Sequence, residues 1–133
     1  MRFIPVPWSD AAARELTRCY DRDGWKYLVS NVLEKDVKSG DATLYEARSP
    51  NGNVYGYVVA HVEIADGKKE FVIAAAAMNA TQSVKSYLPA YEDLARSIGC
   101  EKFRLHSTKK GMWRMFETCG FDNVERVYCK ELI

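Results

Sequence analysis

The sequence lacks several features that would assign a chain to a familiar class. No run approaches the ~18 consecutive apolar residues that a membrane-spanning helix needs. The four cysteines form no CxxC pair, so neither a zinc knuckle nor a thioredoxin-like motif is indicated. The formal net charge is only +1, from 19 basic and 18 acidic residues, so the charge balance favours no nucleic-acid partner and no anionic membrane. No metal-ligand cluster, Walker loop or Ser-His-Asp order is visible.

The first residues also lack the marks of a secretory signal. MRFIPVPWSD contains one arginine and two prolines and has no apolar core. We therefore expect a cytoplasmic protein whose thiols are reduced and mostly buried. A length of 133 residues suits one domain, which we expect to cover residues 1–133 and to bury a core without disulfide bonds.

The first 78 residues predict helices followed by an antiparallel meander. Residues 2–6 fit a short edge strand, and Ser9 or Asp10 can cap a helix that follows. A second amphipathic helix is predicted from Trp25 to Leu33. Three strands then follow at 43–48, 54–64 and 70–78, separated by turn sequences at 49–53 and 65–68.

The last third alternates helix and strand, which favours a parallel crossover. A helix closes on Ile98-Gly99, and Pro89 within it predicts either a start near the proline or a kink. A strand is predicted at 103–107, then a helix at 110–119 that stops on Gly120. The segment VERVYCKEL, residues 124–132, is predicted to form a final strand.

This order of elements resembles the GNAT (GCN5-related N-acetyltransferase) fold, and Gly120-Phe121 after a helix that carries Phe116 is a frequent ending in that family. The resemblance implies an α+β (α/β) fold with a mixed, mostly antiparallel sheet flanked by about four helices. It also implies transfer of an acetyl group from acetyl-CoA to an amine of a small molecule or a protein. In the family, the acyl-CoA lies between the fourth and fifth strands.

The resemblance assigns the cofactor-binding residues to the fourth strand and the following helix start. Ala76, Ala77 and Met78 would lie along the pantetheine arm, and Ala74 to Ala77 are small enough to let it approach, although four alanines can equally pack under a helix. The pyrophosphate loop of the family would correspond to Gln82, Ser83, Val84, Lys85 and Ser86. Lys85 and Tyr87 stand where that loop has glycines, so either free amides at the helix start bind the phosphates or Tyr87 blocks the groove.

The catalytic pattern of the family is also altered. The tyrosine that serves as general acid in many members corresponds to Phe116, which cannot donate a proton. Tyr128, Ser107 or Cys119 could replace it. For a general base, His61 and Glu63 are two residues apart and therefore share a sheet face with Tyr55 and Tyr57, unless that face is simply polar and solvated. Glu46 is a weaker candidate.

Two other functions fit the same residues. The first is a catalytically inactive GNAT-fold protein of phage or mobile-element origin that acts as a structural or binding component. It predicts a groove that Tyr87 occludes. The second is a binding module that uses exposed Tyr45, Tyr55 and Tyr57, which could instead form a homodimer face.

Overall fold

The computed structural model describes residues 1–19, 24–78, 84–107 and 110–132. Five strands form a single sheet: β1 (Arg2–Pro5), β2 (Thr43–Arg48), β3 (Val54–Ala65), β4 (Lys68–Met78) and β5 (Lys102–Arg104). The helices are α1 (Asp10–Arg18), a continuous stretch made of α2 (Trp25–Leu28), the π-helical η1 (Val29–Leu33) and α3 (Glu34–Ser39), and then α4 (Val84–Ser97) and α5 (Lys110–Thr118).

The strands lie in the order β1-β2-β3-β4-β5, and every neighbouring pair is antiparallel except β4 and β5, which are parallel. The crossover through α4 is what makes the last pair parallel. The predicted mixed, mostly antiparallel sheet with about four flanking helices is therefore confirmed. None of the described helices is long and apolar enough to cross a membrane.

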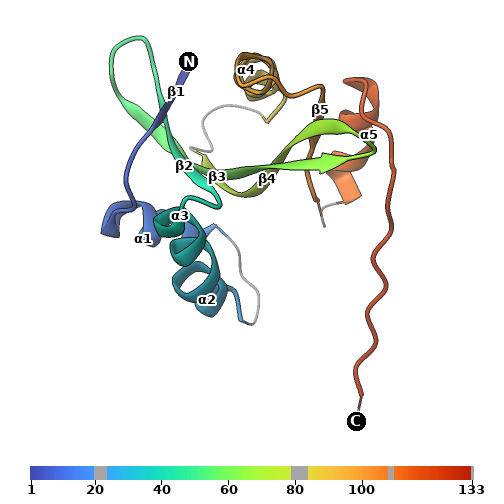
Figure 1. Cartoon of the computed structure of the whole chain (residues 1–133), viewed down its shortest axis with the longest axis horizontal. Helices are drawn as coiled ribbons and strands as arrows, with labels where there is room; N and C mark the ends of the chain where they lie inside the picture. Colours follow the sequence, from blue (N-terminus) through green and yellow to red (C-terminus); the bar gives the residue numbers. More distant parts are fainter. Residues whose placement is uncertain (20–23, 79–83, 108–109, 133) are drawn as a thin grey trace.

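Two core clusters form because the strands bury apolar side chains on both sheet faces. Helices α1 to α3 cover one face and α4 crosses the other (Figure 1). Under α1, Leu16 and Ala12 pack on Val59, Ala75 and neighbouring residues. Under α4, the core is rich in aromatic residues, and Tyr91 stacks on Phe3 with 4.7 Å between the ring centroids.

Local signals in the sequence set several element boundaries. The hydroxyl of Ser9 accepts a hydrogen bond from the amide of Ala12 at 3.1 Å, which caps α1 as predicted. Gly99 and Gly120 have φ values of 82° and 92°, and this left-handed conformation ends α4 and α5. The start of α4 was predicted less well, because the helix begins at Val84 and continues through Pro89.

The C-terminal segment does not form the final strand that its sequence predicts. Residues 121–132 form no strand, and beyond Phe121 their side chains are exposed as the chain runs away from the sheet (Figure 1). Alternation within residues 124–132 was a weak strand signal, because a strand forms only where another strand supplies hydrogen-bond partners. The predicted fifth strand is also shorter than expected, since pairing ends at Arg104.

Candidate active site

Strands β4 and β5 diverge, and this opening is the central feature of the candidate site. They pair only through Glu70–Lys102, Phe71–Phe103 and Val72–Arg104. Strand β4 then continues to Met78, whereas β5 ends at Arg104. In the described part of the chain, β4 therefore has no strand partner on its β5 side beyond Val72. Backbone amides and carbonyls along this edge can bind an extended ligand.

A β-bulge lies on β4 beside the opening. Val59 pairs with Ala75 and Ala60 pairs with Ile73, which leaves Ala74 as the extra residue. The side chain of Ala74 is exposed, whereas Ala75 and Ala77 are buried under α1. Two alanines of the run therefore pack under a helix, and Ala74 faces solvent where the strands separate. Bulges often redirect the backbone next to functional sites.

The predicted cofactor-binding residues follow this opening along the chain. Ala76 and Met78 are half-buried on the α4 side, and Lys85 and Ser86 are exposed in the first turn of α4. Val84 begins that helix. Gln82 and Ser83 lie outside the described residues.

Tyr87 stands where the family has a loop glycine, and Phe116 stands where many members have a tyrosine. Both side chains are part of the core. Tyr87 is 2% exposed and packs with Phe71 and Leu88 under α4, and burial raises the pKa of its hydroxyl. Phe116 is 7% exposed, and its ring centroid lies 5.8 Å from that of Phe121. Tyr87 therefore fills the space between helix and sheet instead of standing exposed at the helix start.

The predicted bases His61 and Glu63 join a chain of polar and ionisable groups across three strands. Nε2 of His61 lies 2.8 Å from Oε1 of Glu63, and Arg104 of β5 donates to the other oxygen of Glu63. Nε of Arg104 lies 2.9 Å from Oε1 of Glu70, without the geometry of a hydrogen bond. His61 pairs with Val72, which is the last residue of β4 that pairs with β5. This cluster of ionisable groups therefore lies where β4 and β5 begin to separate.

The hydrogen bonds decide what each group of the pair can do. The contact with His61, followed by that with Arg104, holds the pKa of Glu63 below its ordinary value. An ionised carboxylate only accepts, so Nε2 of His61 carries the hydrogen and Nδ1 of the neutral ring keeps a lone pair. Glu63 is therefore suited to orienting the ring, and His61 to accepting a proton.

Sequence reasoning missed Glu70 and Arg104. Glu70 has a buried carboxylate, and only the register of β4 against β5 reveals that Arg104 lies beside it. A charged residue inside a largely apolar strand was the available signal. Among the described residues, no group of three or more His, Cys, Asp and Glu could hold a metal ion.

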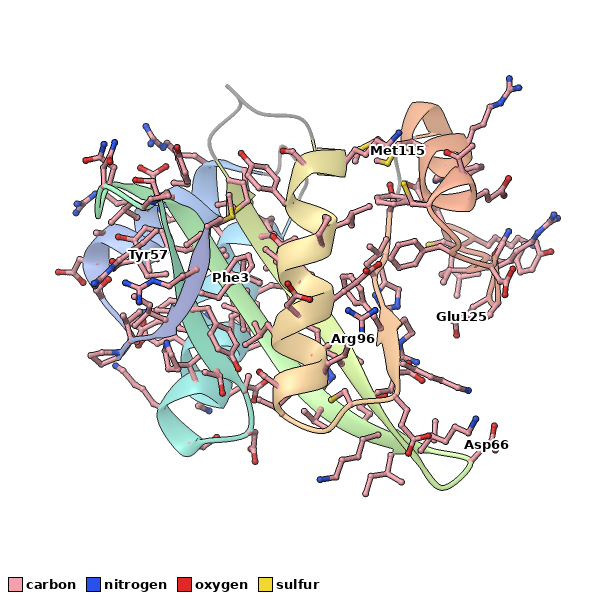
Figure 2. All side chains as sticks on the ribbon, turned by 90° about the horizontal axis from the view of Figure 1, so that it is seen from above. Phe3, Tyr57, Asp66, Arg96, Met115 and Glu125 are labelled. Carbon is pink, nitrogen blue, oxygen red and sulfur yellow. The ribbon has the colours of Figure 1, made fainter. Side chains whose placement is uncertain are left out.

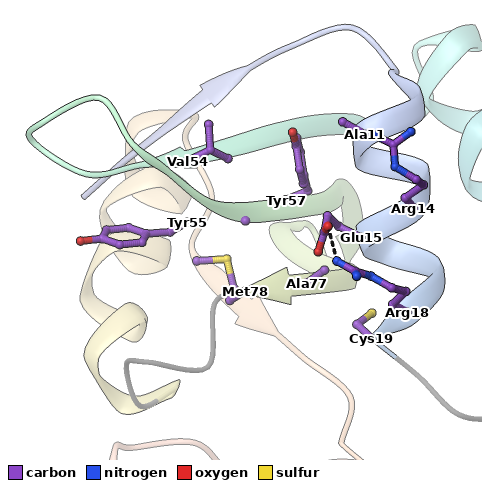
Figure 3. Close-up of a pocket in the computed structure, with 11 residues that line it drawn as sticks. Ala11, Arg14, Glu15, Arg18, Cys19, Val54, Tyr55, Tyr57, Ala77 and Met78 are labelled. Atoms are coloured by element: carbon purple, nitrogen blue, oxygen red, sulfur yellow. Dashed lines mark hydrogen bonds and ion pairs between the residues drawn. The ribbon is translucent and has the colours of Figure 1, made fainter.

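Other predicted residues lie elsewhere. Tyr128 is 86% exposed in the C-terminal segment and is not brought together with His61 or Glu63. Tyr45 is 6% exposed, so the predicted exposed surface of Tyr45, Tyr55 and Tyr57 does not exist as one face. The register shift after Ala47 leaves Tyr55 unpaired with β2, and Tyr55 and Tyr57 point in different directions (Figure 3). Glu46 is already paired with Arg48.

A pocket of about 600 Å³ lies between α1 and the ends of β3 and β4 (Figure 3). Helix α1 contributes Arg14, Glu15 and Arg18, of which the last two form an ion pair. The strands contribute Tyr57 and Met78 among others, and burial raises the pKa of the Tyr57 hydroxyl. Ala77 and Met78 thus line this pocket as well as following the strand opening. The polar face of α1 was not considered from the sequence.

Comparisons with known proteins find similarity in structure alone. No protein-family model and no curated protein sequence matches the chain. A probable acetyltransferase of known structure superposes with a TM-score of 0.70 at 14% identity, covering 100% of this chain and 99% of that one. A GNAT family acetyltransferase from Staphylococcus aureus gives 0.61 at 16% identity, with coverage of 99% and 100%. Glucosamine-6-phosphate N-acetyltransferase from Arabidopsis thaliana gives 0.58 at 16% identity and covers 100% of both chains.

Identities this low, combined with superposition over whole chains, establish a shared architecture and leave activity open. Two of the three structures are matched over at least 99% of both chains at TM-scores above 0.60. This chain therefore has the fold of the GNAT acetyltransferases.

Proposed function

We propose that the chain is an N-acyltransferase that transfers an acetyl group from acetyl-CoA to an amine of a small molecule or a protein. The observation that carries the proposal is the separation of β4 from β5 beyond Val72, next to the bulge at Ala74. The unpaired edge of β4 offers backbone groups to an extended pantetheine arm. A bound thioester would supply the activated acyl group.

The residues of this chain would then act on the incoming amine. An amine attacks only when it is deprotonated, so a base beside the opening is needed. Nδ1 of His61 accepts the proton while the carboxylate of Glu63 holds the ring. The bond from nitrogen to the acyl carbon forms, the carbon–sulfur bond breaks, and the thiolate leaves. Backbone amides of β4 near Ala74 stabilise the negative charge on the acyl oxygen. Tyr128 remains a proposed proton donor only if the C-terminal segment moves.

The start of α4 is proposed to hold the phosphates. Val84 and Lys85 begin α4, where the helix dipole favours negative charge. Ser86 follows them in the helix, and Gln82 and Ser83, which precede Val84 in the sequence, are part of the same proposal. The exposed ammonium group of Lys85 adds positive charge there. We also propose that this one-domain protein works in the cytoplasm.

Calorimetric titration with acetyl-CoA tests the binding step. Ala74 is exposed on β4 beyond the last residue that pairs with β5, so Ala74→Phe would add a bulky side chain beside the opening without disturbing the core. Wild type should bind and Ala74→Phe should lose at least tenfold in affinity. Ile64→Phe, at an exposed position near the β3–β4 turn, is the matched control and should bind as wild type does. Absence of binding at millimolar acetyl-CoA would refute the proposal.

Release of CoA thiol with a panel of amines tests the chemistry. A positioned base contributes roughly 10²–10⁴-fold, so His61→Gln should lower kcat/KM within that range and leave acetyl-CoA affinity unchanged. Glu63→Gln should cause a smaller loss, because the base remains but its orientation is weakened. His106→Gln is the matched control, since His106 is exposed and outside the pair. An equal loss of kcat/KM in His106→Gln protein would contradict the assignment of His61 as the base.

The second candidate is a GNAT-fold protein that has lost acyl transfer and acts as a structural or binding component, with a phage or mobile-element origin as part of the same proposal. The buried Phe116, which has no proton to donate, favours it. The calorimetric titration with acetyl-CoA distinguishes this candidate from the acyltransferase, because the inactive protein is expected to fold but not to bind acetyl-CoA.

A further inference from the structure

The pocket between α1 and the ends of β3 and β4, called the α1 pocket, contains two polar groups that the proposed acyl transfer does not use. Its volume of about 600 Å³ is in the range of small-molecule sites. Arg14 of α1 and Tyr57 of β3 line it from two sides (Figure 3). Among the residues that the structure describes, neither the guanidinium of Arg14 nor the hydroxyl of Tyr57 has a hydrogen-bond partner or an ion pair.

The charges around the α1 pocket leave one positive charge without a counter-ion. Glu15 forms an ion pair with Arg18, and Glu46 forms one with Arg48. Arg14 is therefore the cation of the lining that no carboxylate in the described part of the chain neutralises. A guanidinium binds a carboxylate through two parallel hydrogen bonds. A ligand with one negative charge suits this balance, because a second charge would meet repulsion from Glu15 and Glu46.

The hydroxyl of Tyr57 supplies a second donor beside the guanidinium of Arg14. Burial raises the pKa of this hydroxyl, and the carboxylates of Glu46 and Glu15 raise it further, whereas Arg14 lowers it. The hydroxyl is therefore protonated at neutral pH and able to donate. A ligand carboxylate has two oxygens and can accept from Arg14 and Tyr57 at the same time.

Apolar side chains make up much of the remaining lining. Val54 is 46% exposed, Met78 is half-buried, and Ala11 and Ala77 are small. An aromatic ring in the pocket would cover Val54 and contact the thioether of Met78, whose sulfur packs favourably against ring edges. The lining therefore suits a carboxylate attached to an aromatic ring.

The core under α1 separates this pocket from the proposed base His61. Tyr57, Val59 and His61 point to the same face of β3, because side chains alternate along a strand. Val59 lies between the other two and is fully buried together with Leu16 of α1. Tyr57 lies toward the end of β3 that is far from Asp66 in the β3–β4 turn (Figure 2), and about 13 Å of strand separates it from His61. A ligand in the pocket is therefore not positioned to give a proton to His61.

We propose that the α1 pocket is a second ligand site, which binds an aromatic carboxylate through Arg14 and Tyr57. The carboxylate accepts hydrogen bonds from the guanidinium and the hydroxyl, and the ring lies against Val54 and Met78. The proposal does not depend on acyl transfer, because binding requires neither acetyl-CoA nor an amine. A chain that does not bind acetyl-CoA would refute the proposed function and leave this site intact.

Backbone amide chemical shifts on addition of 2-naphthylacetate test the site. Wild type should show shift changes in α1 and at the ends of β3 and β4 that saturate at millimolar ligand. Arg14→Gln should weaken binding about tenfold or more, because the charge and the paired donors are both lost. Tyr57→Phe should weaken it by a smaller factor, since the ring remains. Arg114→Gln, at an exposed arginine of α5 outside the pocket, is the matched control and should bind as wild type does.

Two analogues test the charge of the ligand. The uncharged 2-naphthylacetamide and 2-naphthyl phosphate, which carries nearly two charges at neutral pH, should both bind more weakly than 2-naphthylacetate. Equal affinity for the amide, or tighter binding of the phosphate, would overturn the proposal. So would shift changes confined to β5 and α4, or no changes at millimolar 2-naphthylacetate.

Discussion

Glu63 accepts hydrogen bonds from residues on two strands, His61 on β3 and Arg104 on β5. Its pKa is held down by His61 first and Arg104 second. A carboxylate with a lowered folded-state pKa stabilises the fold above its ordinary pKa, and that contribution disappears as pH falls through the lowered value. The contact is therefore intact throughout the neutral range.

Carboxyl NMR titration measures this effect. Glu63 should titrate below the ordinary glutamate pKa of about 4.3. Arg104→Gln should raise the pKa of Glu63, but only part of the way, since the stronger contribution from His61 remains. A Glu63 pKa that does not change in Arg104→Gln protein would contradict the assigned contact. Lys102→Gln, on the same strand, serves as the control.

Gly56 allows β3 and β4 to approach closely beside the α1 pocket. A Cβ on Gly56 would lie 2.1 Å from the carbonyl oxygen of Ala77, which belongs to the backbone and cannot turn away. Gly56→Ala should therefore destabilise the fold by about 1–3 kcal/mol, as overpacking does. Hydrogen exchange should also accelerate at Ala77 and Met78.

Gly67 provides the comparison for that prediction. Its φ is 75° and an added Cβ would meet no atom within 4 Å, so Gly67→Ala should cost about 1–2 kcal/mol through backbone strain alone. Amide hydrogen exchange at Ala77 and Met78, at the end of β4, should not change in Gly67→Ala protein. Equal exchange rates at Ala77 in the two variants would show that the close approach at Gly56 is unimportant.

Residue-level predictions from the sequence succeeded where the determinant was local. Ser9 was named as one of two possible caps for α1, and Gly99 and Gly120 were expected to end helices. They failed where the partner was distant in sequence. Tyr45 is buried because β2 lies inside the sheet, and Glu70 was overlooked because Arg104 reaches it only through the parallel register.

Among the elements, α4 contains the clearest conflict between sequence and structure. Pro89 is the sixth residue of a helix that runs from Val84 to Ser97. A proline there has no amide for the carbonyl of Lys85, and its ring crowds that carbonyl. The helix persists because Tyr87, Leu88 and Tyr91 bury apolar surface against the sheet.

Pro89→Ala should therefore stabilise the protein. Removing the interior proline should raise the free energy of unfolding by up to ~3 kcal/mol. The greater conformational freedom of the unfolded chain lowers it by ~0.4–1 kcal/mol, so a net increase of about 2 kcal/mol is expected. Urea unfolding measures it. Glu92→Ala, an exposed change on the same helix, should stay within about 0.5 kcal/mol. Lower stability in Pro89→Ala would mean that the proline shapes the first turn of α4.

Strand and helix periodicity predicted most of these elements, because amphipathic patterns report which face is buried. The bulge at Ala74 and the length of the β4–β5 pairing were not predictable, since both depend on register between strands. The same is true of residues 124–132, where the pattern of a strand occurs without a strand beside it.

On the scale of the whole molecule, one sheet joins the two core clusters and positions the candidate site. The β4–β5 opening, the hydrogen-bonded pair of His61 and Glu63 and the first turn of α4 all follow from the order of the elements along the chain. The pocket against α1 is a competing location for a ligand, because it also includes Ala77 and Met78.

Backbone amide chemical shifts on addition of acetyl-CoA test the central claim most directly, because they report where the cofactor lies. The account predicts the largest shift changes in residues 73–78 of β4, 102–104 of β5 and the first turn of α4, with loss of these changes in Ala74→Phe protein. Changes confined to Arg14, Arg18 and Tyr57 around the α1 pocket, or no changes at millimolar acetyl-CoA, would contradict it.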